Sequence, residues 1–357
     1  MMMEREHVES YIRSRPMLSR LTHLGRGRLE KLHRMLYQNG PGKGTFLSLP
    51  FDQLIEHGAA HIFKWEKENL TDISVTGRGS ADPRTVIELA NKGGFSAIVL
   101  HPGIVDKYQD LLNLNIPLIY KIDGHMTLPQ NPSAPSTIGS IREALKLGAS
   151  AIGMSFYPGS ESTKEDMKRI GCIIEEAHMS GLPAVVWAYA RGPGVSDMGA
   201  DSLYWVHYSC VVAESLGADI IKTKFPEPVK GQKREIYFNY LRKMAKKIAE
   251  AEKYIELEPE EELTEEQHIK RVKLILDAVP RSFVVVSGGP KVRKDPEKAI
   301  ATTTKIVMKA GAEGRIIGRN FWGVPINDGL KYVKIVTNIM NSPQFHRPFN
   351  IRMQDSY

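Results

Sequence analysis

Short apolar segments recur eight times along the chain, and each of them ends in glycine, proline or polar residues. These segments occupy residues 44–52, 96–102, 116–123, 150–158, 182–190, 218–225, 282–289 and 314–320. The stretches between them have the period of amphipathic helices, and several end in glycine, as at 137–149, 163–181, 203–218 and 298–312. Eight strands that alternate with helices predict an α/β fold with a parallel sheet covered on both faces.

The number of predicted strands favours a closed (β/α)8 TIM barrel. The alternative is a doubly wound open sheet, which usually carries a GxGxxG turn after its first strand. The first predicted strand is followed instead by the sequence FDQLIEHG at 51–58. Residues 44–340 are therefore predicted to form one barrel domain that carries the functional site, since barrels often exceed the usual domain length.

Three segments add to the predicted barrel. Residues 1–43 form a basic, partly helical N-terminal extension, and residues 341–357 form a C-terminal tail. A long excursion at 226–281, between the sixth and seventh strands, contains a charged helix at 234–255 and an acidic turn at 256–267. We expect this excursion to be a solvated helical insertion or a subunit contact rather than a catalytic element.

The composition is that of an ordinary globular protein, with 42% hydrophobic and 25% charged residues. Its two cysteines, Cys172 and Cys210, have no metal-like spacing, and one pair in so long a chain does not make a disulfide framework. The N-terminus carries charges where a signal peptide needs an apolar stretch, and no apolar run reaches the roughly 18 residues of a membrane helix. We therefore predict a cytoplasmic protein without a membrane partner.

The net charge of +7 suggests an anionic partner, and the distribution of charges indicates which kind. Lysine and arginine are interleaved with acidic residues, as at 242–273, and form no basic stripe with aromatic residues between them. The sequence also lacks a nucleic-acid-binding motif. A small phosphorylated substrate is therefore favoured over nucleic acid.

Two lysines interrupt the sixth apolar segment. Lys222 and Lys224 lie two residues apart, so a strand places them on the same face. Burial in a barrel disfavours the charged form of an amine, and a neighbouring cation lowers its pKa further, which provides a neutral nucleophile for a Schiff base. The alternative for Lys222 is an ion pair with a carboxylate inside the barrel, and Lys224 could instead face a phosphate.

Other candidate residues follow from the position of chemistry at the C-terminal ends of barrel strands. Tyr189 could exchange protons with a substrate hydroxyl, although a tyrosine at a strand end often only packs there. Asp52 could orient substrate hydroxyls or balance an iminium charge, although an aspartate before a helix is often a cap. The remaining polar residues at these ends include Gln53, Glu56, His57, His101, Lys121, Asp123, His125, Tyr157, Trp187 and Arg191.

Two glycine motifs end the seventh and eighth strands, SGGPK at 287–291 and GRN at 318–320. Backbone amides freed by paired glycines form an anion nest, and the loops after these two strands are the usual phosphate site of a TIM barrel. An arginine there adds a fixed, bidentate cation. Each motif alone is a weak signal, but together they predict a phosphate site formed by Ser287, Gly288, Gly289, Gly318 and Arg319.

Six sequence strings resemble those of a known enzyme family. They are LPFDQLIEHG, FYPGS, VVWAYARG, GADIIKTKF, VVVSGGPK and IIGRN, which occur in this order between about Gly44 and Asn320. In combination they look like the class I fructose-bisphosphate aldolases of the bacterial and archaeal DhnA type. The resemblance implies a metal-free enzyme without a cofactor that cleaves fructose 1,6-bisphosphate to dihydroxyacetone phosphate and glyceraldehyde 3-phosphate, in glycolysis or gluconeogenesis.

The resemblance also implies roles for individual residues. Lys222 matches the Schiff-base lysine, Tyr189 matches the proton donor, and Asp52 matches the aspartate of the first-strand signature. Matches to substrate or phosphate contacts are found at Trp187, Arg191, Ser287, Gly288, Gly289, Gly318 and Arg319. Further substrate-binding candidates are Gln53, His57 and Lys224.

The chain departs from the family at Ala190, where proline often precedes the arginine, and in its additions at 1–43 and 226–281. Such families tend to form rings of identical subunits, commonly decamers, so a homo-oligomer is expected. Two other functions stay open. One is a thiolase-like or transaldolase-like relative that acts on another phosphorylated keto compound. The other is a non-catalytic regulator that binds a phosphorylated metabolite and needs neither Tyr189 nor Lys222.

Overall fold

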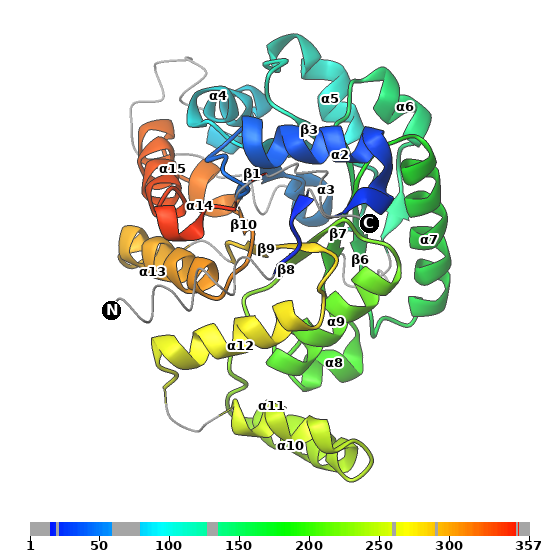
Figure 1. The fold of residues 1–357 in the computed structure, drawn as a ribbon, viewed down its shortest axis with the longest axis vertical. Coiled ribbons are helices and arrows are strands. Elements are labelled where there is room, and N and C mark those ends of the chain that lie inside the picture. Colours follow the sequence, from blue (N-terminus) through cyan, green and yellow to red (C-terminus); the bar gives the residue numbers. More distant parts are fainter. Residues whose placement is uncertain are drawn as a thin grey trace, which may run out of the picture.

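A computed structural model gives the fold and describes residues 15–18, 21–58, 79–126, 135–258, 262–289, 292–347 and 349. Eight parallel strands close into a barrel in the order β1-β10-β9-β8-β7-β6-β3-β2 (Figure 1). They are β1 (Phe46–Phe51), β2 (Ala97–Leu100), β3 (Leu118–Lys121), β6 (Ala151–Phe156), β7 (Ala184–Ala188), β8 (Ile220–Thr223), β9 (Phe283–Ser287) and β10 (Gly314–Ile316). The predicted barrel is confirmed, and the open sheet is wrong because β1 pairs with both β2 and β10.

The strands bury both of their faces, which explains why they read as apolar segments rather than as alternating ones. Val285 and Ile220 point inward and belong to a cluster inside the barrel. Their neighbours Val284, Val286 and Ile221 point outward and belong to the cluster beneath the helices. Because successive side chains of a strand point to opposite faces, each strand contributes both to the cluster inside the barrel and to the cluster beneath the helices.

Helices surround the barrel, and their starts are set by local sequence signals. Asp82, Ser140 and Asp295 accept a backbone hydrogen bond as N-caps, and Thr264 forms a capping box with Gln267. The helices of this layer are α4 (Pro83–Gly93), α5 (Pro102–Tyr108), α6 (Ile141–Lys146), α7 (Thr163–Met179), α9 (Leu203–Ser215), α12 (Glu265–Asp277), α13 (Pro296–Lys309) and α15 (Ile326–Met340). Shorter elements are α3 (Gln53–His57), η6 (Gln109–Leu111), β4 (Asp123–Gly124), β5 (Ser136–Thr137), α8 (Pro193–Asp197) and α14 (Arg319–Trp322).

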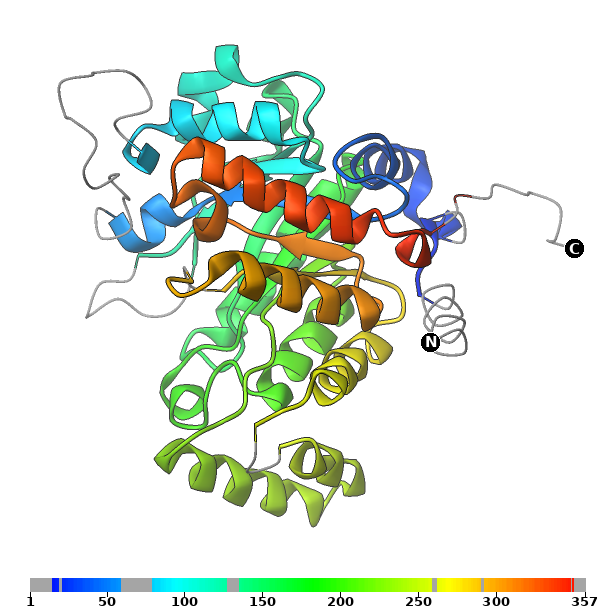
Figure 2. The ribbon, with the colours of Figure 1, turned by 90° about the vertical axis from the view of Figure 1, so that its left-hand side faces the viewer.

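The N-terminal extension lies against the N-terminal ends of the strands. Its described elements are η2 (Thr22–Leu24), α2 (Gly25–His33) and η3 (Arg34–Gln38). Leu32 and Met35 are fully buried in the same cluster as Phe46 and Phe283, which lie inside the barrel. Figure 2 shows this blue segment close to the red η8 (Pro343–Phe345), so the described parts of the extension and of the C-terminal tail lie at the same end of the barrel. The opposite end, where the strands finish, holds the candidate site.

The insertion between β8 and β9 contains α10 (Gln232–Ala245), η7 (Ala249–Ala251) and α11 (Glu252–Glu256) before α12 begins. The prediction of one helix over 234–255 is wrong, because α10 ends at Ala245 and α11 folds back against it. Tyr237, Phe238 and Leu241 of α10 belong to a small apolar cluster that also contains Tyr204 and Trp205 of α9, and Tyr254 of α11 packs against it. In Figures 1 and 2, α10 and α11 project below the barrel, whereas α12 packs between α9 and α13 in the outer layer.

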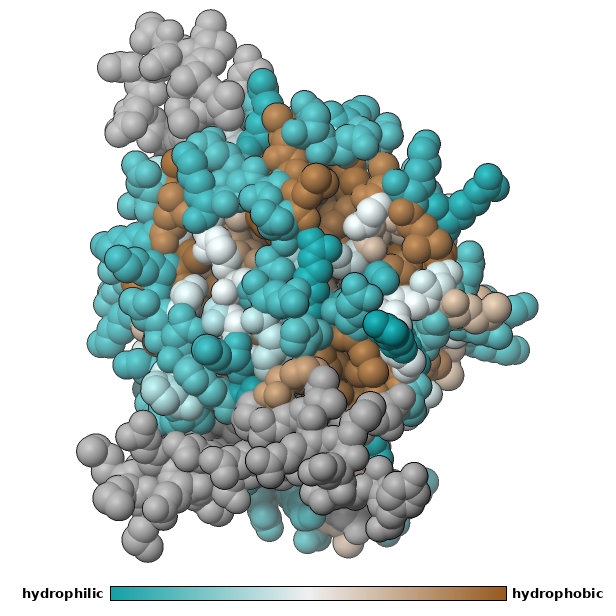
Figure 3. Space-filling model, turned by 45° about the horizontal axis from the view of Figure 1, so that its top comes forward, coloured by the Kyte–Doolittle hydropathy of each residue, from teal (hydrophilic) through white to brown (hydrophobic). Residues whose placement is uncertain are grey.

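The exterior mixes polar and apolar side chains. Figure 3 shows hydrophilic residues over most of one face, with apolar patches between them. No helix of the described residues has the length and apolarity needed to cross a membrane.

Candidate active site

The C-terminal ends of the strands bring several predicted site residues together. Asp52 directly follows β1, Tyr189 directly follows β7, and Lys222 is the third residue of β8. Because β7 and β8 are neighbours in the barrel, Trp187 and Lys222 are paired in register. Residues that are 170 positions apart in the sequence, such as Asp52 and Lys222, therefore share one site.

Lys222 lies at the centre of this group. Its side chain is 6% exposed, and its Nζ lies 3.8 Å from Oδ2 of Asp52. The ring of Trp187 is 4.4 Å from Nζ, measured to its centroid, and the ring of Tyr189 is 5.8 Å away. The sequence left two alternatives for Lys222, a neutral nucleophile or an ion pair with a carboxylate. The structure has features of both, because the amine is buried and faces Asp52 at a distance longer than a hydrogen bond.

The surroundings of Lys222 favour the neutral form of its side chain. Burial lowers the pKa of Lys222 to about 8, because the charged form loses its hydration. Asp52 opposes this shift, whereas the charge of Lys121 adds to it and that of Lys224 adds less. The predicted direction of the shift is confirmed, but the more important neighbouring cation is Lys121 rather than Lys224.

Asp52 is held by groups of the site and not by the helix that follows it. Trp187 donates a hydrogen bond from Nε1 to Oδ2 of Asp52 at 2.8 Å. Asp52 is the N-cap residue of α3, but its side chain makes no capping hydrogen bond. Burial alone would raise the pKa of Asp52, yet the charges of Lys222 and Lys121 outweigh it and hold the pKa below its usual range. Asp52 is therefore an ionised carboxylate aimed at the amine, which disfavours the capping interpretation.

Tyr189 is surrounded by cations. Its ring centroid lies 5.3 Å from Nζ of Lys224 and 5.6 Å from the guanidinium carbon of Arg191. Burial raises the pKa of Tyr189 well above its ordinary value, and the charge of Asp52 raises it further. The phenol therefore keeps its proton at neutral pH and is suited to donate it.

The glycine loop after β9 is fixed by residues at the end of β10. The Nδ2 group of Asn320 donates to the carbonyl of Gly288 at 3.0 Å, and Oδ1 of Asn320 accepts from the amide of Val292 at 2.8 Å. Arg319 donates from Nη2 to the carbonyl of Gly289 at 3.4 Å. Pro290 and Lys291 lie outside the described residues. The sequence prediction did not include Asn320, although it belongs to the GRN motif that was considered.

Both glycines of this loop are required by its shape. Gly289 has a φ of 68°, in the left-handed region that favours glycine. A Cβ on Gly288 would lie 2.9 Å from a methyl group of Ile317, and one on Gly318 would lie 2.9 Å from Nε1 of Trp322. The predicted residues Ser287, Gly288, Gly289, Gly318 and Arg319 are thus brought together at two adjacent strand ends.

Lys224 has a partner that the sequence did not reveal. It follows the end of β8, and its Nζ lies 3.1 Å from Oδ2 of Asp201. Asp201 belongs to the segment that leads into α9. The lysine predicted to face a phosphate is therefore engaged by a carboxylate at the rim, and its role toward a substrate stays a prediction.

Three further predicted residues lie on segments that follow β1 and β7, at the same end of the barrel. The guanidinium carbon of Arg191 lies 5.6 Å from the ring centroid of Tyr157 as well as from that of Tyr189. Gln53 and His57 lie on α3, where Nε2 of His57 is 3.8 Å from a carboxylate oxygen of Glu56. Among the described residues no hydrogen-bond partner occurs for Oε1 of Gln53, which is buried.

A second buried charge network supports the site, and sequence reasoning identified only part of it. Lys121 forms an ion pair with Asp123, which is fully buried. The other carboxylate oxygen of Asp123 accepts from the amide of Ser155 at 2.8 Å and from Arg169 at 2.9 Å. The alternation of Lys121 and Asp123 within an apolar run was a signal for this network, whereas Arg169 on α7 gave none. The network fixes the cation that lowers the pKa of Lys222.

Comparison with known proteins agrees with this geometry. A model of the DeoC/LacD family aldolases matches residues 46–323, which is most of the barrel. The chain belongs to this aldolase family. The resemblance predicted from the sequence motifs is thereby confirmed at the level of the family.

Two named relatives are class 1 fructose-bisphosphate aldolases or probable members of that class. The class 1 fructose-bisphosphate aldolase of Thermoproteus tenax is 29% identical over 310 residues, which cover 87% of this chain and 95% of the relative. A probable class 1 fructose-bisphosphate aldolase of Chlamydia muridarum is 26% identical over 321 residues, covering 88% of this chain and 85% of the relative.

A solved structure shows a related barrel in a reacting state. It is an archaeal fructose-1,6-bisphosphate aldolase whose catalytic lysine is covalently bound to the carbinolamine intermediate of the substrate. It superimposes with a TM-score of 0.66 at 26% identity and covers 88% of this chain and 99% of that one.

The chemistry of this aldolase site depends on an amine and its neighbours. Among the described residues, no group of three or more histidine, cysteine, aspartate or glutamate side chains is arranged to hold a metal ion. The groups that do converge are a buried amine, an ionised carboxylate, a protonated phenol and an arginine beside a glycine loop. Such a set can form and break an iminium on a phosphorylated carbonyl compound.

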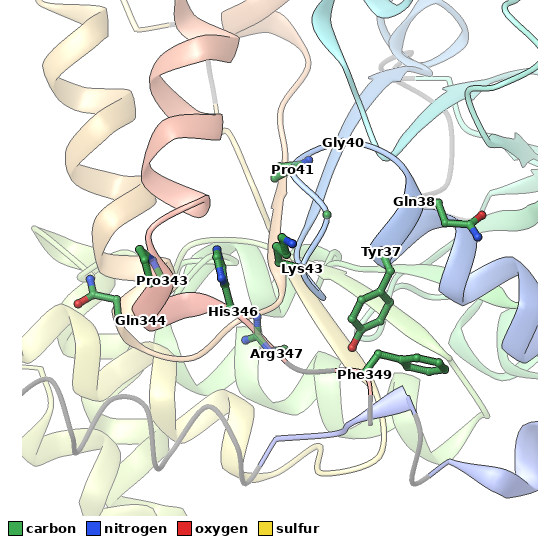
Figure 4. A pocket seen from close by; sticks show the side chains of 11 residues that line it. Tyr37, Gln38, Gly40, Pro41, Lys43, Pro343, Gln344, His346, Arg347 and Phe349 are labelled. Carbon is green, nitrogen blue, oxygen red and sulfur yellow. The ribbon is translucent and has the colours of Figure 1, made fainter. Parts of the chain in front are cut away.

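A cavity of about 680 Å³ lies far from this chemistry. It is formed where the extension meets the C-terminal tail, and Tyr37, Lys43, His346 and Phe349 are among its lining residues (Figure 4). These residues belong to the end of the barrel opposite the candidate site. This cavity therefore does not coincide with the candidate site, which is marked instead by a lysine with a shifted pKa.

Proposed function

We propose that this chain is a class I fructose-bisphosphate aldolase in which Lys222 forms the Schiff base. It cleaves fructose 1,6-bisphosphate reversibly to dihydroxyacetone phosphate and glyceraldehyde 3-phosphate. The observation that carries the proposal is the buried amine of Lys222, whose pKa is lowered to about 8 beside an ionised Asp52. At pH 7 about one such lysine in ten is neutral, compared with fewer than one in a thousand for an ordinary lysine.

The first step is the addition of the neutral amine to the C2 carbonyl of the open-chain sugar. The carbinolamine that results loses its hydroxyl group as water once a proton is supplied. Tyr189 keeps its proton at neutral pH and is suited to supply it. The products of this step are an iminium cation at Lys222 and a phenolate, and Asp52 balances the new positive charge.

The phenolate then serves as the base for cleavage. It removes the proton of the C4 hydroxyl, the C3–C4 bond breaks, and its electron pair passes into the iminium to give an enamine. Glyceraldehyde 3-phosphate leaves, and the regenerated Tyr189 hydroxyl returns the proton to C3 of the enamine. Addition of water to the iminium and the reverse of the first step release dihydroxyacetone phosphate and restore the amine.

The phosphate groups give the substrate its fixed position. The glycine loop and Arg319 supply backbone amides and a guanidinium at adjacent strand ends, an arrangement suited to a phosphate dianion. The guanidinium carbon of Arg191 lies 5.6 Å from the ring centroid of Tyr189, so this second cation is suited to the other phosphate or to a sugar hydroxyl.

The other expectations from the sequence accompany this proposal. We propose residues 44–340 as the catalytic domain and residues 1–43, 226–281 and 341–357 as additions to it. Homo-oligomer formation, a cytoplasmic location and a function in glycolysis or gluconeogenesis stay predictions.

One assay tests the proposed function. Purified protein is incubated with fructose 1,6-bisphosphate in the presence of EDTA, and both triose phosphates are measured with coupling enzymes. We expect cleavage that EDTA does not reduce. Absence of cleavage, with turnover of a different phosphorylated keto compound, would identify the related lysine-dependent enzyme that the sequence left open.

A further inference from the structure

Arg315 is a buried cation without an acidic partner. Its side chain on β10 is 2% exposed, and it donates three hydrogen bonds, all to neutral acceptors. The acceptors are the carbonyl of Val286 at 3.1 Å, the carbonyl of Ser287 at 3.3 Å and the hydroxyl of Thr304 at 3.1 Å. No carboxylate among the described residues forms an ion pair with it.

The other buried lysines and arginines of the described chain do have a carboxylate. The pairs are Lys121 with Asp123, Lys222 with Asp52, Arg271 with Glu258, and both Arg15 and Arg347 with Glu313. A buried guanidinium that lacks such a partner loses its hydration without an equivalent return. Its pKa is lowered to about 10 by burial, so it still carries its charge at neutral pH. Among the described residues, no ion pair offsets the burial of this charge.

Arg315 lies directly behind the glycine loop. The two carbonyls that it binds are those of the last two residues of β9, and Gly288 and Gly289 follow at once. Its contact with Thr304 on α13 places the guanidinium in the layer between the barrel wall and that helix. The cavity beside it has a volume of about 20 Å³, which holds about one water molecule and no phosphate group.

We propose that Arg315 is a positioning residue for the phosphate site. Its hydrogen bonds turn the carbonyls of Val286 and Ser287 away from the loop, so that these dipoles do not oppose an anion. Its charge acts through a poorly screened interior and favours a phosphate dianion at the amides of Gly288 and Gly289. The inference deepens the proposed function and depends on it, since that function puts the substrate phosphate at this loop.

The test measures phosphate affinity directly by isothermal titration of inorganic phosphate into wild-type protein and three variants. Arg315→Met removes the charge and keeps an unbranched side chain, and Arg315→Lys keeps the charge. Lys305→Met removes an exposed cation from α13, the helix that Arg315 contacts through Thr304. We expect Arg315→Met to weaken phosphate binding about three- to tenfold. Arg315→Lys stays within about twofold of wild type, and Lys305→Met leaves the affinity unchanged.

A second pair of measurements separates this role from a structural one. Arg315→Met removes an unpaired buried charge, which favours stability, but it also leaves three acceptors without a donor, so we expect a melting temperature close to that of wild type. Borohydride trapping with dihydroxyacetone, which has no phosphate, should be unchanged in that variant. Equal phosphate affinity in wild type and Arg315→Met overturns the inference. So does an equal loss of affinity in both Arg315 variants accompanied by lower melting temperatures.

Failure of the inference about Arg315 can be distinguished from failure of the proposed function. If wild-type protein does not cleave fructose 1,6-bisphosphate, the proposed function fails, while the titration with inorganic phosphate still supports or overturns the role of Arg315. If wild-type protein cleaves the substrate but Arg315→Met binds phosphate as tightly as wild type, only the inference about Arg315 fails.

Discussion

The two ends of the barrel both bury a carboxylate among cations, and they use it differently. At the N-terminal end, Glu313 lies 3.4 Å from Arg15 and 3.6 Å from Arg347. At the C-terminal end, Asp52 lies 3.8 Å from Lys222. The first cluster joins the extension and the tail to the barrel, whereas the second belongs to the proposed aldolase site.

The difference is in the number of hydrogen bonds that each cation has. Arg15 donates to the carbonyls of Leu276, Val279 and Ser282, and Arg347 donates to two further carbonyls. The Nζ atom of Lys222 lies 3.8 Å from the carboxylate of Asp52, which is longer than a hydrogen bond, and 4.4 Å from the ring centroid of Trp187. A buried cation that donates several hydrogen bonds stabilises the structure around it, whereas one that is buried with few partners gives up its proton more readily.

The strongest test of this contrast is the replacement of the amine itself. Lys222→Met should abolish cleavage, because no other group forms the Schiff base. Asp52 loses its ion pair, which lowers stability, but it keeps the hydrogen bond from Trp187, so we expect the protein to remain folded. Activity and far-UV circular dichroism measure the two effects. Lys224→Met is the matched control and should retain measurable cleavage, while retained cleavage in Lys222→Met would contradict the assignment.

At the other end, Glu313→Gln should affect stability and not chemistry. The substitution leaves two buried guanidinium groups without a carboxylate, and we expect a loss of about 3–5 kcal/mol in the free energy of unfolding. Urea denaturation measures that loss, and kcat of the folded fraction should equal that of wild type. A stable variant with reduced kcat would show that the two ends do not divide structure and chemistry as described.

Within the proposed active site, removal of the Tyr189 hydroxyl group should have the next largest effect on the rate of cleavage. Tyr189→Phe keeps the ring and its packing but removes the proton that the cleavage cycle transfers. We expect cleavage of fructose 1,6-bisphosphate to slow at least about 100-fold. Borohydride should still trap dihydroxyacetone phosphate on the enzyme, because water or another group can replace Tyr189 as the proton source for iminium formation, whereas cleavage needs a base at the C4 hydroxyl. Near-normal cleavage would assign the proton transfer to another group, such as Glu56.

A smaller effect is expected at the phosphate loop. Arg319→Ala removes a charge-assisted contact worth roughly 1.5–3 kcal/mol, so KM for the bisphosphate should rise about tenfold or more. Steady-state kinetics measure this change, and the melting temperature verifies that the variant is folded. An unchanged KM would remove Arg319 from the phosphate site.

Much of the fold follows from the sequence because its signals are local. Each of the eight strands lies within one predicted apolar run, since glycine, proline and polar residues bound every run. The helix predicted over 234–255 failed because its break depends on α11 packing back onto α10, which is a tertiary effect. No periodicity within a single segment records such a contact.

The residues of the candidate site also fall into those that the sequence predicted and those that depend on tertiary structure. Lys222, Tyr189 and Asp52 were predicted because their strand ends could be counted, and a closed barrel brings those ends together. The pairing of Lys224 with Asp201 joins residues 23 positions apart, and that of Arg169 with Asp123 joins residues 46 apart. Such partners depend on loop paths and helix orientation, which the hydrophobic pattern does not specify.

The central claim is that Lys222 is a nucleophile because burial lowers its pKa. The most direct measurement is the rate of borohydride trapping with dihydroxyacetone phosphate between pH 6 and pH 10, with the adduct mapped by peptide mass spectrometry. The neutral fraction of the amine grows as pH rises through its pKa, so the rate should rise to a midpoint at a pH of about 8 and then level off, with the adduct on Lys222. A rate that is still rising at pH 10, or an adduct on Lys121 or Lys224, would contradict the account.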